Sequence, residues 1–178
     1  MIVCAGRNET FKFAEAIGVG LIESAINLTR ICLFNKPDFI LFIGSAGSYG
    51  KHNIFDIVES KRASNIELGF LTQSAYTPLD NVLESENKFA RNDTIVNSSN
   101  YISTNEELCK EFEAYGVGIE NMEYFSILSV AKEFEIPVAG IFIVTNYTNE
   151  NAHEDFLKNH QEAKEKLTKY LLDKNIIK

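Results

Sequence analysis

The chain has 178 residues, a formal net charge of −8 and a hydrophobic fraction of 45%. This length predicts a single domain over residues 1–178 with a sizeable core, and the acidic balance argues against nucleic acid as a partner. The three cysteines, at positions 4, 32 and 109, form no metal-binding pattern. No secretory leader or membrane-spanning run stands out, so we expect a cytoplasmic protein without a membrane partner. The cysteine pattern predicts no metal site, and we expect no cofactor.

Apolar runs and amphipathic segments alternate along the chain. Continuous apolar runs rich in β-branched and aromatic residues predict strands buried on both faces, and apolar residues at helical spacing predict helices. In chain order, we expect strand 1–5, helix 21–34, strand 38–44, short strands 54–58 and 94–97, helices 105–114 and 122–134, strand 137–145 and helix 152–172. Residues 51–95 are expected to be richer in strand. The alternation predicts an α/β fold, a three-layer αβα arrangement around a central mixed, mostly parallel sheet.

Small and polar residues follow the predicted strands. Ligands bind at the carboxyl ends of strands in such sheets, which directs attention to the loop after Ala5, to Gly44-Ser-Ala-Gly-Ser48 and to Thr145-Asn-Tyr-Thr-Asn149. A glycine turn can bring backbone N–H groups close to an anion, a water molecule or a ribose hydroxyl. The alternative interpretation of the 44–48 and 145–149 segments is an ordinary strand-ending turn.

Two further groups of residues suggest ligand contacts. A carboxylate at Glu123, at the start of an apolar helix, could accept hydrogen bonds from two sugar hydroxyls, or could simply be an acid favoured by the helix dipole. The amide of Asn146 could address a purine edge, or serve as a turn residue. We interpret His153 as a solvated residue at a helix start and not as a catalyst.

Five stretches together resemble the purine nucleoside phosphorylase superfamily, and most of all its 5′-methylthioadenosine/S-adenosylhomocysteine nucleosidases. The stretches follow one another at the family's order and spacing over about residues 17–172. They are 18–25, 36–47, 53–58, 94–102 with 121–123, and 145–156. The resemblance implies a nucleoside phosphorylase-like fold and a homo-oligomer, either a dimer or a hexamer.

The resemblance also implies roles for individual residues. Asn146 and Glu9 are the catalytic candidates, with Asn146 facing purine N7 and Glu9 activating the attacking water. Met122 and Glu123 would hold the ribose, and Tyr101 would stack on the purine. The complete set of implied substrate-binding residues is Ser45, Gly47, Tyr101, Met122, Glu123 and Thr145.

Three departures from the family leave the reaction open. Asn146 stands where nucleosidases place a proton-donating aspartic acid, and an amide cannot deliver a proton. Asn121 replaces a glutamate, and Phe42 stands where bacterial phosphorylases place a phosphate-binding arginine, although Arg7 could substitute for it. We expect hydrolysis of the base–ribose bond of a small-molecule purine nucleoside. The alternatives are phosphorolysis of 6-oxopurine nucleosides, with phosphate as co-substrate, and nucleoside binding without catalysis.

Overall fold

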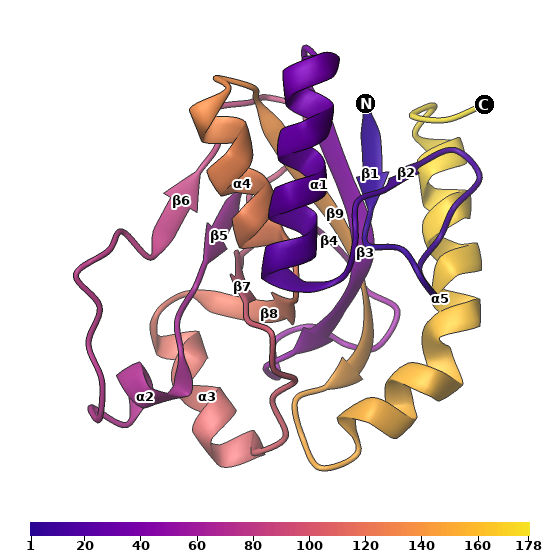
Figure 1. Ribbon diagram of the computed structural model, residues 1–178. Coiled ribbons are helices and arrows are strands. Elements are labelled where there is room, and N and C mark those ends of the chain that lie inside the picture. The colour runs from indigo at the N-terminus through magenta and orange to yellow at the C-terminus, as the bar shows by residue number, and fades with distance from the viewer.

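Nine strands form one mixed sheet in the computed structural model, which describes residues 1–178 (Figure 1). The strands are β1 Ile2–Cys4, β2 Glu15–Ala16, β3 Ile40–Ser48, β4 Ile57–Ser60, β5 Arg62–Ser64, β6 Val82–Glu84, β7 Ile95–Ser98, β8 Val117–Asn121 and β9 Val138–Tyr147. The helices are α1 Gly20–Phe34, α2 Leu68–Leu71, α3 Glu106–Ala114, α4 Tyr124–Glu133 and α5 Ala152–Asp173. None of these helices combines the length and the apolar character that crossing a membrane requires.

The sheet is mixed and mostly parallel, as predicted. β3 lies at its centre and runs parallel to both β1 and β9. The strands predicted at 1–5, 38–44 and 137–145 from their apolar runs therefore lie side by side. β8 pairs antiparallel with the end of β3 and parallel with β7, and so joins the second half of the sheet to the first. The sequence analysis did not predict β8.

The buried side chains of β3 and β9 alternate between two helical layers. On one face, Phe42 and Phe142 belong to the cluster that holds α1 and α4. On the other face, Ile43 and Ile141 belong to the cluster that holds Leu167 and other residues of α5. Because both faces of these strands are covered, their sequences are apolar at nearly every position. The three-layer αβα arrangement is therefore confirmed (Figure 1).

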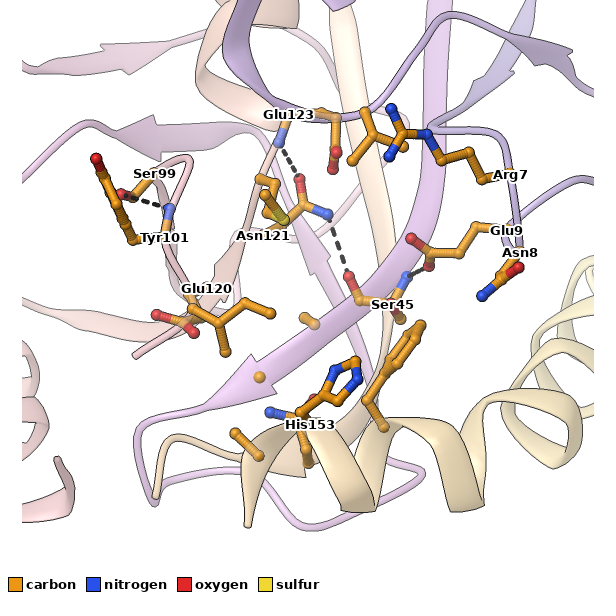
Figure 2. Close-up of a pocket in the computed structure, with 18 of the residues that line it drawn as sticks. Arg7, Asn8, Glu9, Ser45, Ser99, Tyr101, Glu120, Asn121, Glu123 and His153 are labelled. Carbon is orange, nitrogen blue, oxygen red and sulfur yellow. Dashed lines mark hydrogen bonds between the residues drawn. The ribbon is translucent and has the colours of Figure 1, made fainter. Parts of the chain in front are cut away.

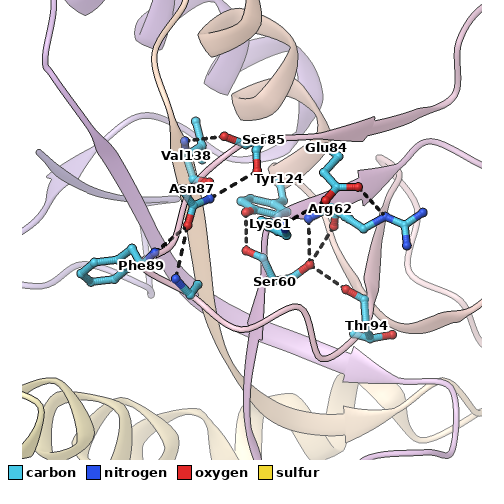
Figure 3. A network of polar contacts seen from close by, with 11 residues as sticks. Ser60, Lys61, Arg62, Glu84, Ser85, Asn87, Phe89, Thr94, Tyr124 and Val138 are labelled. Atoms are coloured by element: carbon cyan, nitrogen blue, oxygen red, sulfur yellow. Dashed lines mark hydrogen bonds and ion pairs between the residues drawn. The ribbon is translucent and has the colours of Figure 1, made fainter.

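Polar side chains fasten the loops of the second half of the sheet to its centre (Figure 3). The Asn87 side chain donates to the Val138 carbonyl at 2.6 Å, and the Val138 N–H donates to Ser85 Oγ at 2.7 Å. The buried Tyr124 hydroxyl donates to the Ser60 carbonyl at 2.7 Å. This last bond fixes the first residue of α4 against the end of β4, and α4 begins directly after Glu123.

The two central strands run further than the predicted ranges 38–44 and 137–145, into segments that were expected to be loops. β3 continues through Gly44-Ser-Ala-Gly-Ser48, and β9 continues through Thr145 and Asn146 to Tyr147. The two strands pair along this whole length, and their pairing satisfies the backbone groups that a turn would expose. The pairing is interrupted once, between Ala46 and Gly47, where β9 contains one extra residue.

Candidate active site

A pocket of about 360 Å³ lies where two strands end beside the middle of β3. β1 pairs with β3 only at Leu41 and Phe42, whereas β8 approaches from the opposite direction and pairs at Gly47 and Ser48. This edge of β3 is therefore unpaired in between, and loops from both strands converge on it. The volume of the pocket suits a small-molecule ligand. The lining residues are Gly6, Arg7, Asn8, Glu9, Val19, Ser45, Ala46, Gly47, Ser99, Tyr101, Ile102, Glu120, Asn121, Met122, Glu123, Asn146, Ala152, His153 and Phe156.

Side chains satisfy the unpaired backbone of Ser45 (Figure 2). Its N–H donates to Glu9 Oε1 at 2.7 Å, and its carbonyl accepts from the Asn121 amide at 3.1 Å. The loop after β1 delivers Glu9, and a bridge between Gly6 and Glu9 holds that loop. Glu9, the predicted catalytic carboxylate, therefore lies directly beside Ser45, a predicted substrate-binding residue.

Glu123 is held in the turn between β8 and α4. Asn121 Oδ1 accepts from the N–H groups of Glu123 and Tyr124 at 2.8 and 3.0 Å, which fixes this turn. The Glu123 side chain is buried, with Oε1 accepting from the Gly20 N–H at 2.8 Å. Burial, followed by the negative charge of Glu9, raises the pKa of Glu123 to about 8. Two acidic side chains thus act on each other across the pocket.

Asn146 enters the pocket through the irregularity in β9. Ala46 pairs with Val144 and Gly47 with Asn146, so Thr145 is the extra residue of a bulge. A Cβ atom on Gly47 would lie 3.0 Å from Asn146 Nδ2, so glycine leaves the space that the amide occupies. Asn146 Oδ1 accepts from the Thr145 hydroxyl at 2.9 Å, and Nδ2 donates to the Tyr147 carbonyl at 3.1 Å. One amide N–H remains for a ligand.

Thr145, predicted to bind substrate, is the one predicted site residue that lies outside the pocket lining. Thr145 is fully buried and does not line the pocket. Its hydroxyl is used on Asn146, and its carbonyl accepts from the Asn159 side chain of α5 at 2.8 Å. The Thr145 side chain therefore supports the Asn146 amide beside it. The other predicted residues, Ser45, Gly47, Tyr101, Met122, Glu123, Glu9 and Asn146, all line the pocket.

One wall of the pocket depends on a residue that the sequence analysis missed. Glu120 of β8 accepts from the N–H and hydroxyl of Ser103 at 3.0 and 2.6 Å and from the Tyr49 hydroxyl at 2.9 Å. Burial raises the pKa of Glu120. These bonds hold the segment that carries Tyr101, whose side chain is 78% exposed. An exposed aromatic ring at the rim is free to cover a planar ligand.

The opposite wall comes from the first turn of α5. His153 and Phe156 are three positions apart in the helix, so they lie on the same side of it, and both line the pocket. Figure 2 shows His153 and Glu123 on opposite sides of Ser45. The interpretation of His153 as exposed at a helix start is correct, but the residue also faces the pocket.

The cationic and metal-binding potential of the pocket is small. Arg7 lines it and lies 3.6 Å from Glu23. Phe42 is fully buried and stacks near Tyr124 and Phe142 in the core, so that position does not face the pocket. No group of three His, Cys, Asp or Glu side chains is arranged to hold a metal ion.

The model of a known family, described as the phosphorylase superfamily, matches residues 2–174. The chain belongs to the phosphorylase superfamily. Comparison with curated protein sequences gives no significant match. The sequence resemblance to this superfamily is therefore confirmed across almost the whole chain, although the individual proteins that share the fold are distant in sequence.

Solved structures of this superfamily share the fold at low identity. A mutant of the Helicobacter pylori nucleosidase MTAN with 5′-methylthioadenosine in the active site has TM-score 0.78 and 16% identity, covering 97% of this chain and 95% of that chain. Futalosine hydrolase of Helicobacter pylori has TM-score 0.77 and 17% identity, covering 96% and 94%. The Streptococcus pneumoniae MTA/SAH nucleosidase in complex with 8-aminoadenine has TM-score 0.74 and 14% identity, covering 96% of each chain.

Proposed function

We propose that this protein hydrolyses the N-glycosidic bond of a purine nucleoside. The observation that carries the proposal is the pair of acidic residues, Glu9 and Glu123, which line one pocket with Ser45 and act on each other electrostatically. The structures similar to this chain are those of nucleosidases and a futalosine hydrolase, which supports the same reaction class.

Each step of the reaction requires a group that the pocket contains. Cleavage gives the ribose positive, oxocarbenium-like character, and nearby carboxylates stabilise that charge. Glu123 is suited to hold ribose hydroxyls together with Met122, and Glu9 is suited to accept a proton from the attacking water. Asn146 offers its remaining N–H to purine N7, and Tyr101 offers an aromatic face to the base.

Phosphorolysis of 6-oxopurine nucleosides is the second candidate. Its supporting observation is Arg7, a cation that lines the pocket in only a loose ion pair, 3.6 Å from Glu23. Two glutamates close to the same space work against a multiply charged anion, because like charges disfavour one another at short range. Hydrolysis therefore stays the preferred reaction.

Release of free base decides between these reactions. Purified protein is incubated with inosine, guanosine, adenosine and 5′-methylthioadenosine, with and without inorganic phosphate, and free base is quantified by chromatography. Base release independent of phosphate is the expected result. Strict dependence on phosphate would establish phosphorolysis, and nucleoside binding without any base release would identify a binding protein that has lost catalysis.

We also propose a homo-oligomer. The outer face of α1 supports this, because it carries large apolar side chains that are mostly exposed, and Phe34 reaches 89% exposure. The exposed members are Ile22, Ile26, Leu33 and Phe34. Exposed apolar patches of this kind mark protein–protein contacts. Light scattering coupled to size-exclusion chromatography measures the mass, and a monomer of 20.1 kDa would contradict the proposal.

A further inference from the structure

The leaving purine needs a proton, and the residue nearest to the expected base position cannot supply one. Asn146 has an amide, which donates hydrogen bonds but does not transfer a proton at neutral pH. Its oxygen and one of its N–H groups already bond to Thr145 and Tyr147. A nucleosidase built on this pocket therefore needs a separate acid.

We propose that His153 is the general acid that protonates the leaving purine. This inference rests on the proposed glycosidic cleavage and adds a residue to it. His153 is the only histidine that lines the pocket, and histidine is the side chain that ordinarily exchanges its proton between about pH 5 and 8. Its side chain makes no hydrogen bond within the protein, unlike His160 on the same helix, whose Nδ1 lies 3.2 Å from the Leu157 carbonyl.

The position of His153 matches the base side of the pocket. Glu123 and Glu9 define the sugar side, and Figure 2 shows His153 across Ser45 from Glu123. Asn146 pairs with Gly47, two residues beyond Ser45 on β3. The chain then reaches α5 through a short turn, in which the Thr148 N–H donates to the Ser48 carbonyl at 3.1 Å. This turn keeps the first residues of α5 close to the strand end that carries Asn146.

The proton transfer can be written so that it balances. The C1′–N9 bond breaks, and its electron pair moves into the purine. The imidazolium of His153 gives its proton to a ring nitrogen of the purine, which leaves as the neutral base. The water oxygen bonds to C1′, and the displaced water proton moves to Glu9. Exchange with solvent then restores the imidazolium and the Glu9 carboxylate.

Several charged groups lie on the first turn of the same helix or line the same pocket as His153. They are Glu154 and Asp155 on its own helix, and Arg7, Glu9, Glu120 and Glu123 from the other elements that line the pocket. His153 is exposed to solvent on its other side, which allows reprotonation between turnovers.

The test compares leaving groups that need a proton with one that does not. His153→Gln and the control His160→Gln are assayed with purine nucleosides and with 4-nitrophenyl β-D-ribofuranoside, whose phenolate leaves unprotonated. General acid catalysis typically contributes about 10²–10⁴-fold, so we expect His153→Gln to lower purine release at least about 100-fold. Turnover of the nitrophenyl riboside should stay within about twofold of wild type, and His160→Gln should leave the turnover of both substrates within the same limit.

Other outcomes overturn the proposal in separate ways. An equal loss with both substrates would show that His153 binds the sugar, and no loss with either would show that it is a solvated residue. Wild-type cleavage of the nitrophenyl riboside alone would mean that no acid serves the purine, although glycosidic cleavage would stand. If wild type cleaved neither substrate, the proposed function would fail and the role of His153 with it. Circular dichroism of both variants confirms that they fold.

Discussion

Replacing Glu123 with glutamine tests the centre of the proposed site. The side chain is 2% exposed, and its pKa is raised from the ordinary 4.5 to about 8. Because the folded protein holds this proton more tightly than the unfolded chain, the free energy of unfolding falls as pH rises from about 4.5 to about 8. A raised pKa of this size corresponds to about 5 kcal/mol over the full range, at about 1.36 kcal/mol per pH unit, as an upper bound.

Glutamine keeps an oxygen for the Gly20 N–H but cannot ionise, so Glu123→Gln lacks this pH dependence. We expect the stability of the variant to rise relative to wild type by about 3 kcal/mol between pH 5.5 and 8. Urea unfolding at both pH values measures the difference, and Glu133→Gln, an exposed glutamate at the other end of α4, is the control. Identical pH dependence in Glu123→Gln and wild type would refute the effect of burial on this carboxyl.

The same variant should lose function. Above pH 8, where the Glu123 carboxyl is ionised, hydrogen bonds to this charged group are worth about 1.5–3 kcal/mol. At about pH 9, nucleoside affinity or turnover should therefore fall at least about tenfold. Calorimetric titration with inosine measures affinity, and chromatography measures base release. Unchanged binding and turnover would show that Glu123 is only an acid at a helix start.

Three further substitutions address the rest of the site. Wild type should release base faster from inosine or guanosine than from adenosine, because a 6-oxopurine leaves with less need of a full proton. Asn146→Asp should shift the inosine-to-adenosine turnover ratio toward adenosine. A wild type that prefers adenosine, with a turnover ratio unaffected by substitution at position 146, would contradict the assignment. Glu9→Gln should lower kcat by about 10²–10⁴-fold with little change in KM, since the amide still accepts from Ser45 but takes no proton from water; an unchanged kcat would remove Glu9 from the chemistry. Gly47→Ala places a Cβ atom 3.0 Å from Asn146 Nδ2. This variant should lose about 1–3 kcal/mol of folding stability and bind nucleoside more weakly. If calorimetry finds that the variant keeps wild-type affinity and stability, the close fit at Gly47 is disproved.

The central strands could be predicted from the sequence because their physical setting leaves a strong pattern. β3 and β9 are covered on both faces, so Ile40–Ile43 and Val138–Val144 are apolar at almost every position. β8 has no such pattern. Its five residues, Val117–Asn121, include a glycine and two polar side chains, and they form a strand because β3 and β7 lie on either side. Pairing with distant strands is not visible in a local window of sequence.

The candidate site was predictable only where motifs mark it. Ser45, Met122 and Glu123 lie in stretches that resemble the family, and they line the pocket. Glu120 was missed because β8 was not expected, and an acid in an unassigned segment ordinarily belongs to the surface. His153 was placed at a helix start, but local sequence does not reveal which cavity a helix start faces. That depends on the turn between β9 and α5.

The bulge at Thr145 connects the fold to the site. Leu41 and Ile43 of β3 pack with α5, so by alternation Ser45 and Gly47 belong to the same face of the sheet. On β9, Val144 packs with the opposite cluster, and regular alternation would turn Asn146 to that face as well. The extra residue resets the alternation and brings Asn146 level with Gly47, on the side where α5 begins. Thr145 then becomes the buried support of the amide, which explains why this residue of the motif lies outside the pocket lining while its neighbour Asn146 enters it.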